Sequence, residues 1–223
     1  FDELYPGTVG DAFQSNAGRE TPSFDFVHPI RSKSSGYVQG IDATELMSFA
    51  KTNRAVVRLS CRPGDFIREN ESIAIVTEID DWCDDHADQV RYGFTIGFSR
   101  TPTQDIFFIL NEFVEVATRA LSPGVNVPFT AMQCIDWLSV GLVKLSRRKL
   151  PPSHRVDDDG DVRIITTEVT YQDFVDSMLG QLIPYAKDDA NARDYFVKSM
   201  QRVTSTSNNC ELNHLIEEQV HRI

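Results

Sequence analysis

The sequence lacks several patterns that would assign it to a known chemistry. Its four cysteines lie far apart and form no C-x-x-C pair, so neither a disulfide framework nor a zinc ribbon is predicted. No stretch approaches the roughly 18 consecutive apolar residues that a membrane-spanning helix needs. Positive charge is scarce, because 22 Lys and Arg stand against 33 Asp and Glu. Nucleic-acid-binding proteins usually carry a basic stripe, so we do not expect nucleic acid as a partner.

Sequence motifs for catalysis are missing as well. The chain contains no G-x-S-x-G elbow, no G-x-x-x-x-G-K phosphate loop and no H-E-x-x-H pair. We therefore predict no catalytic residues and no cofactor, and the interpretation as an enzyme is open but not favoured.

One acidic segment, "DDWCDDHAD" over 80–88, contains residue types that bind metals. Carboxylates at the start of a helix are also favoured by the helix dipole alone. The dipole explains the segment without a ligand, so we predict no metal site.

The hydrophobic pattern predicts an α+β chain in two units. Residues 24–80 alternate apolar and polar positions as strands do, with one helix over 43–54 that has Asp42 as its N-cap. The segment after Pro63 is similar to the turns of lipoyl- and biotinyl-like domains, which makes this small β-rich unit barrel-like. No lysine stands where those carriers are modified. A mainly helical unit over 81–223, packed on the first, is expected to carry a β-ribbon near 155–169, with "DDDGD" as its turn. Residues 1–23, rich in Gly, Pro, Ser and Asn, are interpreted as a linker.

Two helix boundaries in the helical unit carry specific expectations. The segment "DDHADQVRYGFTIGF" is interpreted as one helix that is broken or loosened by Gly93 and Gly97. The next helix is expected to start with a capping box formed by Thr101 and Gln104 and to run to Leu121. Its apolar stripe is so wide that little solvent face is left, which is typical of a bundle centre or a subunit contact.

The helix that follows begins in an unusual way. Pro128 suits the first helical position, but the preceding residue, Val127, has no oxygen to offer the free amides of the first turn. We expect Asn126 to supply that oxygen instead.

Several ordered segments together resemble one family. They are "LYP" (4–6), "SGYVQGID" (35–42), "RLSCRPGDF" (58–66), "RTPTQD" (100–105) and "ALSPGVNVPFTA" (120–131). These segments are similar to motifs of the bacterial predicted membrane protein family called domain of unknown function 2254. That family typically has Asp where this chain has Val127. The resemblance implies a soluble region that follows a four-helix membrane anchor missing from this chain. It also implies a bacterial inner-membrane location with this region on the cytoplasmic side.

Two functional hypotheses follow. The first is a cytoplasmic domain that assembles or regulates a channel- or transporter-like membrane protein, and it self-associates through the helix 103–121 or its neighbour 128–146. The second is a small-molecule binding module or enzyme, with a pocket walled by the 122–130 loop and the 36–42 strand. Its candidate binding residues are Ser122, Asn126, Thr130, Gln39 and Asp42. A plain helix-to-helix turn explains the loop residues equally well.

Overall fold

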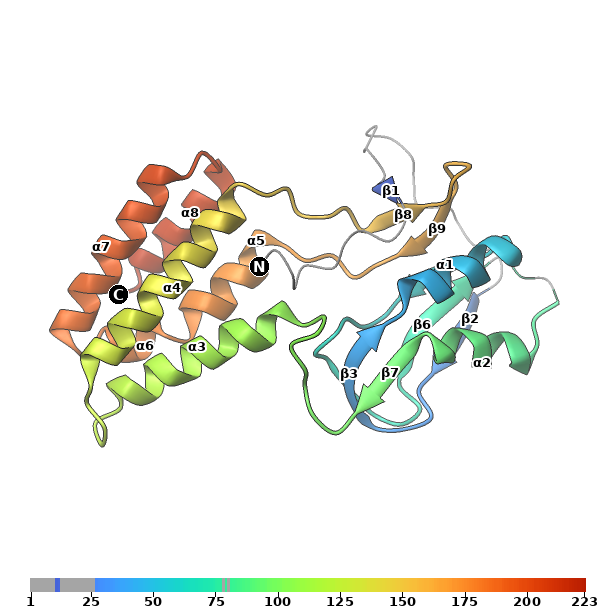
Figure 1. Ribbon diagram of the computed structural model, residues 1–223, viewed down its shortest axis with the longest axis horizontal. Helices are drawn as coiled ribbons and strands as arrows, with labels where there is room; N and C mark the ends of the chain where they lie inside the picture. The colour runs from blue at the N-terminus through green and yellow to red at the C-terminus, as the bar shows by residue number, and fades with distance from the viewer. Residues whose placement is uncertain (1–10, 13–26, 78, 80) are drawn as a thin grey trace. The chain divides into compact units, whose positions relative to one another are not determined.

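The computed structural model describes residues 11–12, 27–77, 79 and 81–223 (Figure 1). Apart from residues 11 and 12, the predicted linker over 1–23 lies outside the described residues. The chain divides into two compact units. The helical unit contains Ile106–Leu150 and Val169–Ile223, and the sheet unit contains the described residues up to Asp105 together with Pro151–Glu168. The predicted α+β class is confirmed.

The sheet unit is built from two sheets, and among the described residues they form no closed barrel. The larger sheet has the strand order β1-β8-β9-β4-β6-β2 and the smaller one β5-β3-β7. The strands are β1 (Asp11–Ala12), β2 (Val27–Arg31), β3 (Gly36–Ile41), β4 (Val56–Leu59), β5 (Phe66–Ile67), β6 (Ser72–Thr77), β7 (Phe94–Gly97), β8 (His154–Val156) and β9 (Val162–Ile165). Neighbours pair antiparallel except β4 and β9, which run parallel.

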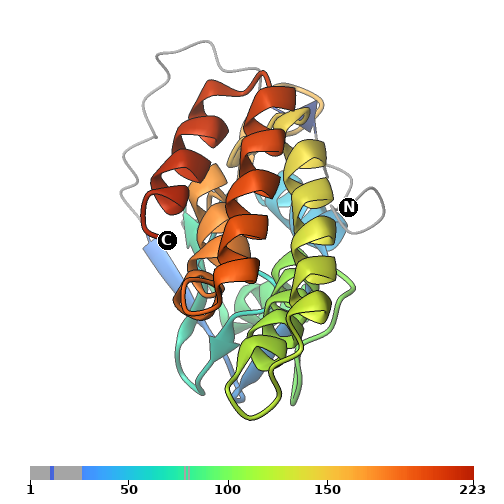
Figure 2. The same cartoon turned by 90° about the vertical axis from the view of Figure 1, so that its left-hand side faces the viewer.

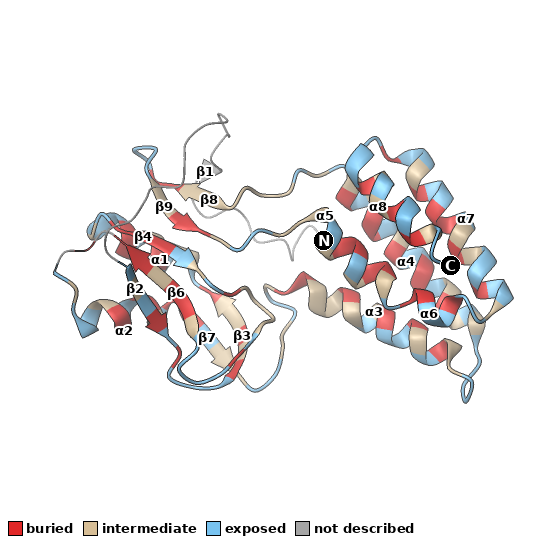
Figure 3. Cartoon of the chain, turned by 180° about the vertical axis from the view of Figure 1, so that it is seen from behind, coloured by how far each residue is buried: buried red, intermediate tan, exposed pale blue. Residues whose placement is uncertain are grey.

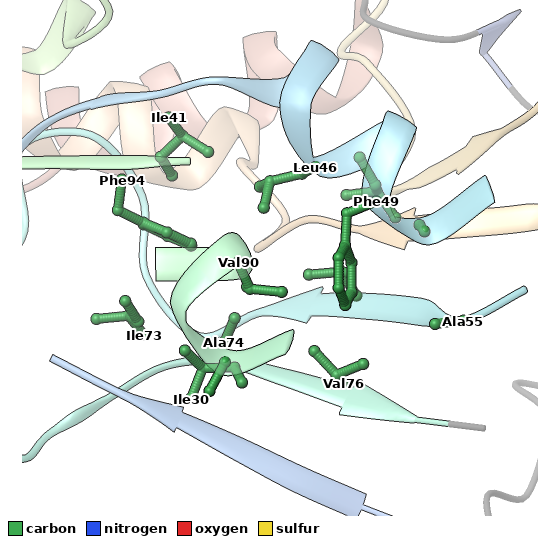
Figure 4. Packing of buried hydrophobic residues seen from close by; sticks show 14 of the residues in the cluster. Ile30, Ile41, Leu46, Phe49, Ala55, Ile73, Ala74, Val76, Val90 and Phe94 are labelled. Atoms are coloured by element: carbon green, nitrogen blue, oxygen red, sulfur yellow. The ribbon is translucent and has the colours of Figure 1, made fainter. Parts of the chain in front are cut away.

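Helices α1 (Ala43–Thr52) and α2 (Asp84–Tyr92) supply the other part of the sheet unit's core. Asp42 accepts hydrogen bonds from the N–H groups of Thr44 and Glu45 at 3.0 Å, which confirms the predicted N-cap of α1. Figure 4 shows side chains from both helices and from the strands gathered in one apolar cluster. The members that it labels include Leu46, Phe49, Val90, Ile73 and Val76, all buried. This packing holds strand β3, which carries the predicted candidate Gln39 and is followed by the candidate Asp42.

The compact units divide the chain differently from the predicted boundary at residue 80. Helix α2 ends at Tyr92, and the next residues form strand β7, which pairs with β3. The helix is therefore broken at Gly93, as one of the two alternatives had it, and the expected continuation of the helix through Gly97 is wrong. The ribbon of β8 and β9 forms as predicted around its Asp-Gly turn, but it belongs to the sheet unit because β9 pairs with β4.

The expected capping box at Thr101 is also wrong. Helix α3 (Ile106–Leu121) begins only after Asp105. Gln104 turns its side chain to strand β3, where its Oε1 accepts from the N–H of Ile41 at 2.9 Å. The amide of Gln104 thus satisfies a sheet backbone group instead of a helix end.

The helical unit contains α3, α4 (Pro128–Ser146), α5 (Tyr171–Val175), the π-helix η1 (Asp176–Gly180), α6 (Ile183–Ala186), α7 (Ala190–Thr206) and α8 (Cys210–Val220). Figure 2 shows α4, α7 and α8 side by side, and α4 packs on both α3 and α7. Helix α3 is held on another side by α5 and η1. Phe107 stacks on Phe174 with ring centroids 4.9 Å apart, and Ser177 donates a hydrogen bond to Asn111 at 2.8 Å.

Candidate functional site

The turn between α3 and α4 is the segment in which the sequence placed most of its candidate residues. The N–H groups of Val125 and Asn126 both donate to the carbonyl of Ser122, at 3.0 and 2.9 Å. The N–H of Val127 donates to the carbonyl of Ala120 at 2.8 Å. The turn therefore uses these backbone amides to close on itself, and it offers a ligand fewer donors than its sequence suggests.

The three candidate residues of this turn have local roles. The hydroxyl of Ser122 donates to the carbonyl of Arg119 at 2.7 Å, at the end of α3. Asn126 has a φ of 47°, in the left-handed region that asparagine tolerates better than most residues. The N–H of Thr130 donates to the carbonyl of Val127 at 3.1 Å. These contacts shape a helix-to-helix turn.

The start of α4 shows how the helix begins although Val127 has no side-chain oxygen to cap it. Val127 occupies the N-cap position, and no side chain caps the helix there. The expectation that Asn126 supplies the oxygen is wrong, because this residue takes the left-handed conformation and the helix begins after it, at Pro128. The missing side-chain cap costs the helix about 1 kcal/mol.

Large apolar side chains project into solvent around this turn. Phe129 is 78% exposed, Val125 is 51% exposed and Val127 is 45% exposed. Figure 3 shows the segment in the colour of exposed residues. It lies within the longest run of the chain without Asp, Glu, Lys or Arg, residues 120–135. We call residues 123–129 the hairpin tip.

A second group of exposed apolar residues lies along the sides of the same two helices. Val116 of α3 is 48% exposed, and on α4 Trp137 is 63% exposed and Val140 is 46% exposed. Trp137 and Val140 are three residues apart and so share one face of α4. We call these three residues the outer face.

The edge of the outer face toward α7 is polar. Tyr195 of α7 donates a hydrogen bond from its hydroxyl to Asp136 of α4 at 2.8 Å. This bond to the carboxylate raises the pKa of Tyr195. The interaction fixes α4 against α7 and bounds the outer face on that side.

The two candidates on the sheet unit also make structural contacts. Gln39 donates from its side chain to the carbonyl of Ser99 at 2.8 Å, across the space that Gly97 leaves free of a side chain. Asp42 is the N-cap of α1. Ser122, Asn126 and Thr130 belong to the helical unit, and Gln39 and Asp42 belong to the sheet unit. A pocket that combines all five stays a prediction.

A buried carboxylate in the sheet unit was not among the predicted candidates. Asp105 is 3% exposed, and its Oδ2 accepts from Nε of Arg100 at 2.8 Å and pairs with Nη2 at 2.7 Å. The carboxylate lies against Gly64 of the "RPGD" turn. Three segments that are far apart in the sequence, 36–42, 62–65 and 99–105, therefore meet. These three segments overlap three of the motifs that resemble the family, and this overlap is the sequence signal that could have indicated their importance.

The cysteines fall into two classes. Cys61 and Cys134 are buried and Cys83 and Cys210 are exposed, and all four are free. Burial raises the pKa of the Cys61 thiol to about 12 and also raises that of Cys134. Within the described residues, no three His, Cys, Asp or Glu side chains are placed to hold a metal ion. In the same part of the chain, no helix is both long and apolar enough to cross a bilayer.

These features define an α+β protein in which α3 and α4 form a helical hairpin whose turn is closed by its own hydrogen bonds. The described residues show no recognisable group of catalytic residues. The model of the family DUF2254, described as "Predicted membrane protein", matches residues 9–202. The chain therefore belongs to this predicted membrane protein family, as its motifs indicated.

Similar proteins are known from mycobacteria. Uncharacterized protein MT1328 of Mycobacterium tuberculosis (strain CDC 1551 / Oshkosh) is 31% identical over 172 residues, which cover 72% of this chain and 31% of the relative. Uncharacterized protein Mb1321c of Mycobacterium bovis matches with the same identity and the same coverage. The chain thus spans about a third of the length of these relatives. No solved structure matches significantly.

Proposed function

We propose that this chain is an assembly domain of a bacterial membrane protein, which it helps to build or regulate by self-association through the outer face. The complete protein would be a homo-oligomer of channel- or transporter-like type. The proposal places this region on the cytoplasmic side of the inner membrane, attached through an anchor outside this chain.

The observation that carries the proposal is the exposure of Val116, Trp137 and Val140 on two helices that pack together. Tryptophan is enriched at the centres of protein interfaces, and exposed large apolar side chains that gather on a soluble domain often mark a contact site. Because both helices belong to the compact helical unit, the backbone that carries the outer face needs little ordering on contact.

The membership of a membrane protein family supports a symmetric arrangement. Homo-oligomers usually have closed symmetry, and domains attached to membrane subunits then share an axis normal to the bilayer. The four free cysteines fit a reducing compartment and so support the cytoplasmic side.

Analytical ultracentrifugation of the chain at micromolar concentrations tests the proposal. We expect a concentration-dependent oligomer that Val116→Glu and Trp137→Glu each convert to a folded monomer. Gln201→Glu on the exposed side of α7 is the matched control, and it should leave the oligomer intact. A wild-type chain that stays monomeric at high micromolar concentration would contradict the proposal for this region.

The alternative, a ligand-binding module at the 122–130 loop, gains no support from the backbone contacts of the turn. A thermal-shift screen against nucleotides and common metabolites addresses it. A ligand that raises the melting temperature of the wild type but not of Asn126→Ala would favour this second function.

A further inference from the structure

We propose that the hairpin tip inserts into the boundary between headgroups and acyl chains of a phospholipid bilayer. This contact goes beyond the proposed assembly function, because it uses the end of the hairpin and not its outer face. The two contacts are geometrically compatible: a hairpin that touches the membrane with its tip presents the sides of its helices to neighbouring copies.

The first support is the chemistry of the exposed side chains. Val125, Val127 and Phe129 are each at least 45% exposed, and they lie within a segment of five residues. No charged residue occurs from 120 to 135, although a quarter of the chain is charged. Exposed apolar side chains without neighbouring charges would not stabilise a tip that faced only water. Phenylalanine and valine are side chains that transfer favourably from water to the acyl boundary.

The second support is the hydrogen bonding of the backbone. Insertion into an apolar medium is costly for any N–H group that has no internal partner. The N–H groups of Val125, Asn126 and Val127 all donate within the turn, and Pro128 has no N–H. At these four positions, insertion would therefore leave no N–H group of the backbone without a partner.

The third support is the conformation of the turn. The left-handed Asn126 and the internal hydrogen bonds hold the backbone of the segment in one conformation, so the backbone needs little ordering on insertion. No atom lies within 4 Å of a Cβ built on Gly124, so none of the described residues beyond its chain neighbours covers this position of the tip.

Charge argues for a zwitterionic lipid surface as the occupant. The chain carries a net charge of −11, so an anionic surface or an acidic protein would repel it, and the tip offers no cation for a headgroup phosphate. A bilayer is also the surface next to which members of a predicted membrane protein family reside. Apolar insertion must then supply the binding energy.

Flotation of the chain with small phosphatidylcholine vesicles tests the proposal. We expect the wild type to float at millimolar lipid, with no gain when phosphatidylglycerol is added. Phe129→Ser should weaken vesicle binding about tenfold, because it removes the largest inserted side chain. Tyr185→Ser on α6, where a side chain is 45% exposed, is the matched control and should leave binding unchanged.

Val127→Asp separates binding from folding. An aspartate at the N-cap should raise the melting temperature, whereas its charge at the tip should weaken vesicle binding. A loss of binding in a more stable protein cannot come from unfolding.

Three results would overturn the proposal. They are a wild type that does not float at millimolar lipid, binding that Phe129→Ser leaves unchanged, and a tip substitution that dissociates an oligomer in the absence of lipid. The last result would assign the tip to a second copy of the chain. The failure of the assembly function is distinguishable, because the Trp137→Glu variant keeps the tip and should still float.

Discussion

Asp105 lies so close to Gly64 that a Cβ built on the glycine would stand 2.2 Å from Oδ2 of the aspartate. Gly64 also has a φ of +96°, a conformation that costs little only for glycine. The N–H of Gly64 donates to the carbonyl of Val38 at 2.8 Å, so the same turn is held to strand β3. The glycine thus makes room for a buried carboxylate at the last residue of the first segment of the sheet unit.

Replacing Gly64 by alanine is therefore expected to destabilise the protein by at least about 2 kcal/mol, because it adds backbone strain to a clash with a buried group. Urea unfolding followed by circular dichroism measures the loss. Gly124→Ala is the control, since a Cβ there meets nothing within 4 Å. Equal stability of the two variants would show that the turn can shift away from Asp105.

The ion pair of Arg100 and Asp105 makes a second prediction. The Arg100 side chain is 25% exposed and that of Asp105 is 2% exposed, so the pair lies between the surface and fully buried cases. We expect Arg100→Met to cost about 2–3 kcal/mol, because it leaves a buried carboxylate without this partner. A double-mutant cycle with Asp105→Asn isolates the pair. A coupling free energy near zero would mean that the other contacts of Asp105 hold the segment.

The bare N-cap of α4 makes a third prediction. Val127→Asp should raise the free energy of unfolding by about 0.5–1 kcal/mol, because the new carboxylate can accept from the free amides of the first turn. Val127→Ala shortens the side chain without adding a cap and should not reproduce the gain. Thermal unfolding of the three proteins in parallel decides between a cap and a general effect of the side chain.

The thiols make a prediction about pH. Burial raises the pKa of Cys61 from 9.0 to about 12, so the folded protein holds this proton while the unfolded chain loses it. The contribution to stability is complete below pH 9 and is lost as the pH rises from about 9 toward about 12. The steepest slope from this single group is about 1.4 kcal/mol per pH unit. Cys61→Ala should flatten the stability profile in this range.

Thiol reactivity supplies an independent check of the same burial. At neutral pH, a disulfide reagent should modify two thiols rapidly, those of Cys83 and Cys210. The thiols of Cys61 and Cys134 should react only at the rate of unfolding. Rapid modification of all four cysteines in the folded protein would contradict the structure.

Local signals in the sequence were sufficient where a residue acts on its own neighbours. Asp42 caps α1 because its oxygen reaches amides two and three residues away, and the ribbon turns at an Asp-Gly pair. The same reasoning failed at Gln104, whose partner, Ile41, is 63 positions away in the sequence. The sequence alone does not distinguish a Gln in a capping box from a Gln whose side chain bonds to a distant strand.

The placement of strands shows the same limit. Residues 94–97 continue a helical pattern in the sequence, but Gly93 ends α2 and the pairing with β3 takes the next residues into the sheet. The candidate site was predictable only in part. The sequence indicated the 122–130 loop and the 36–42 strand, but the exposure of Phe129 and Trp137 depends on which helix faces are covered. A single sequence does not contain that information.

The parallel pairing of β4 with β9 also governs the order in which the chain can fold. Val57 pairs with Ile164, and the whole α3–α4 hairpin lies between them in the sequence. During synthesis, the hairpin must therefore emerge from the ribosome before β9 is available to complete the larger sheet. Contacts of such long sequence separation also form slowly. Until then one edge of β4 has unpaired backbone groups, which is the kind of edge that promotes aggregation. Truncations that end before residue 165 should consequently be insoluble, even though they retain most of the sheet unit.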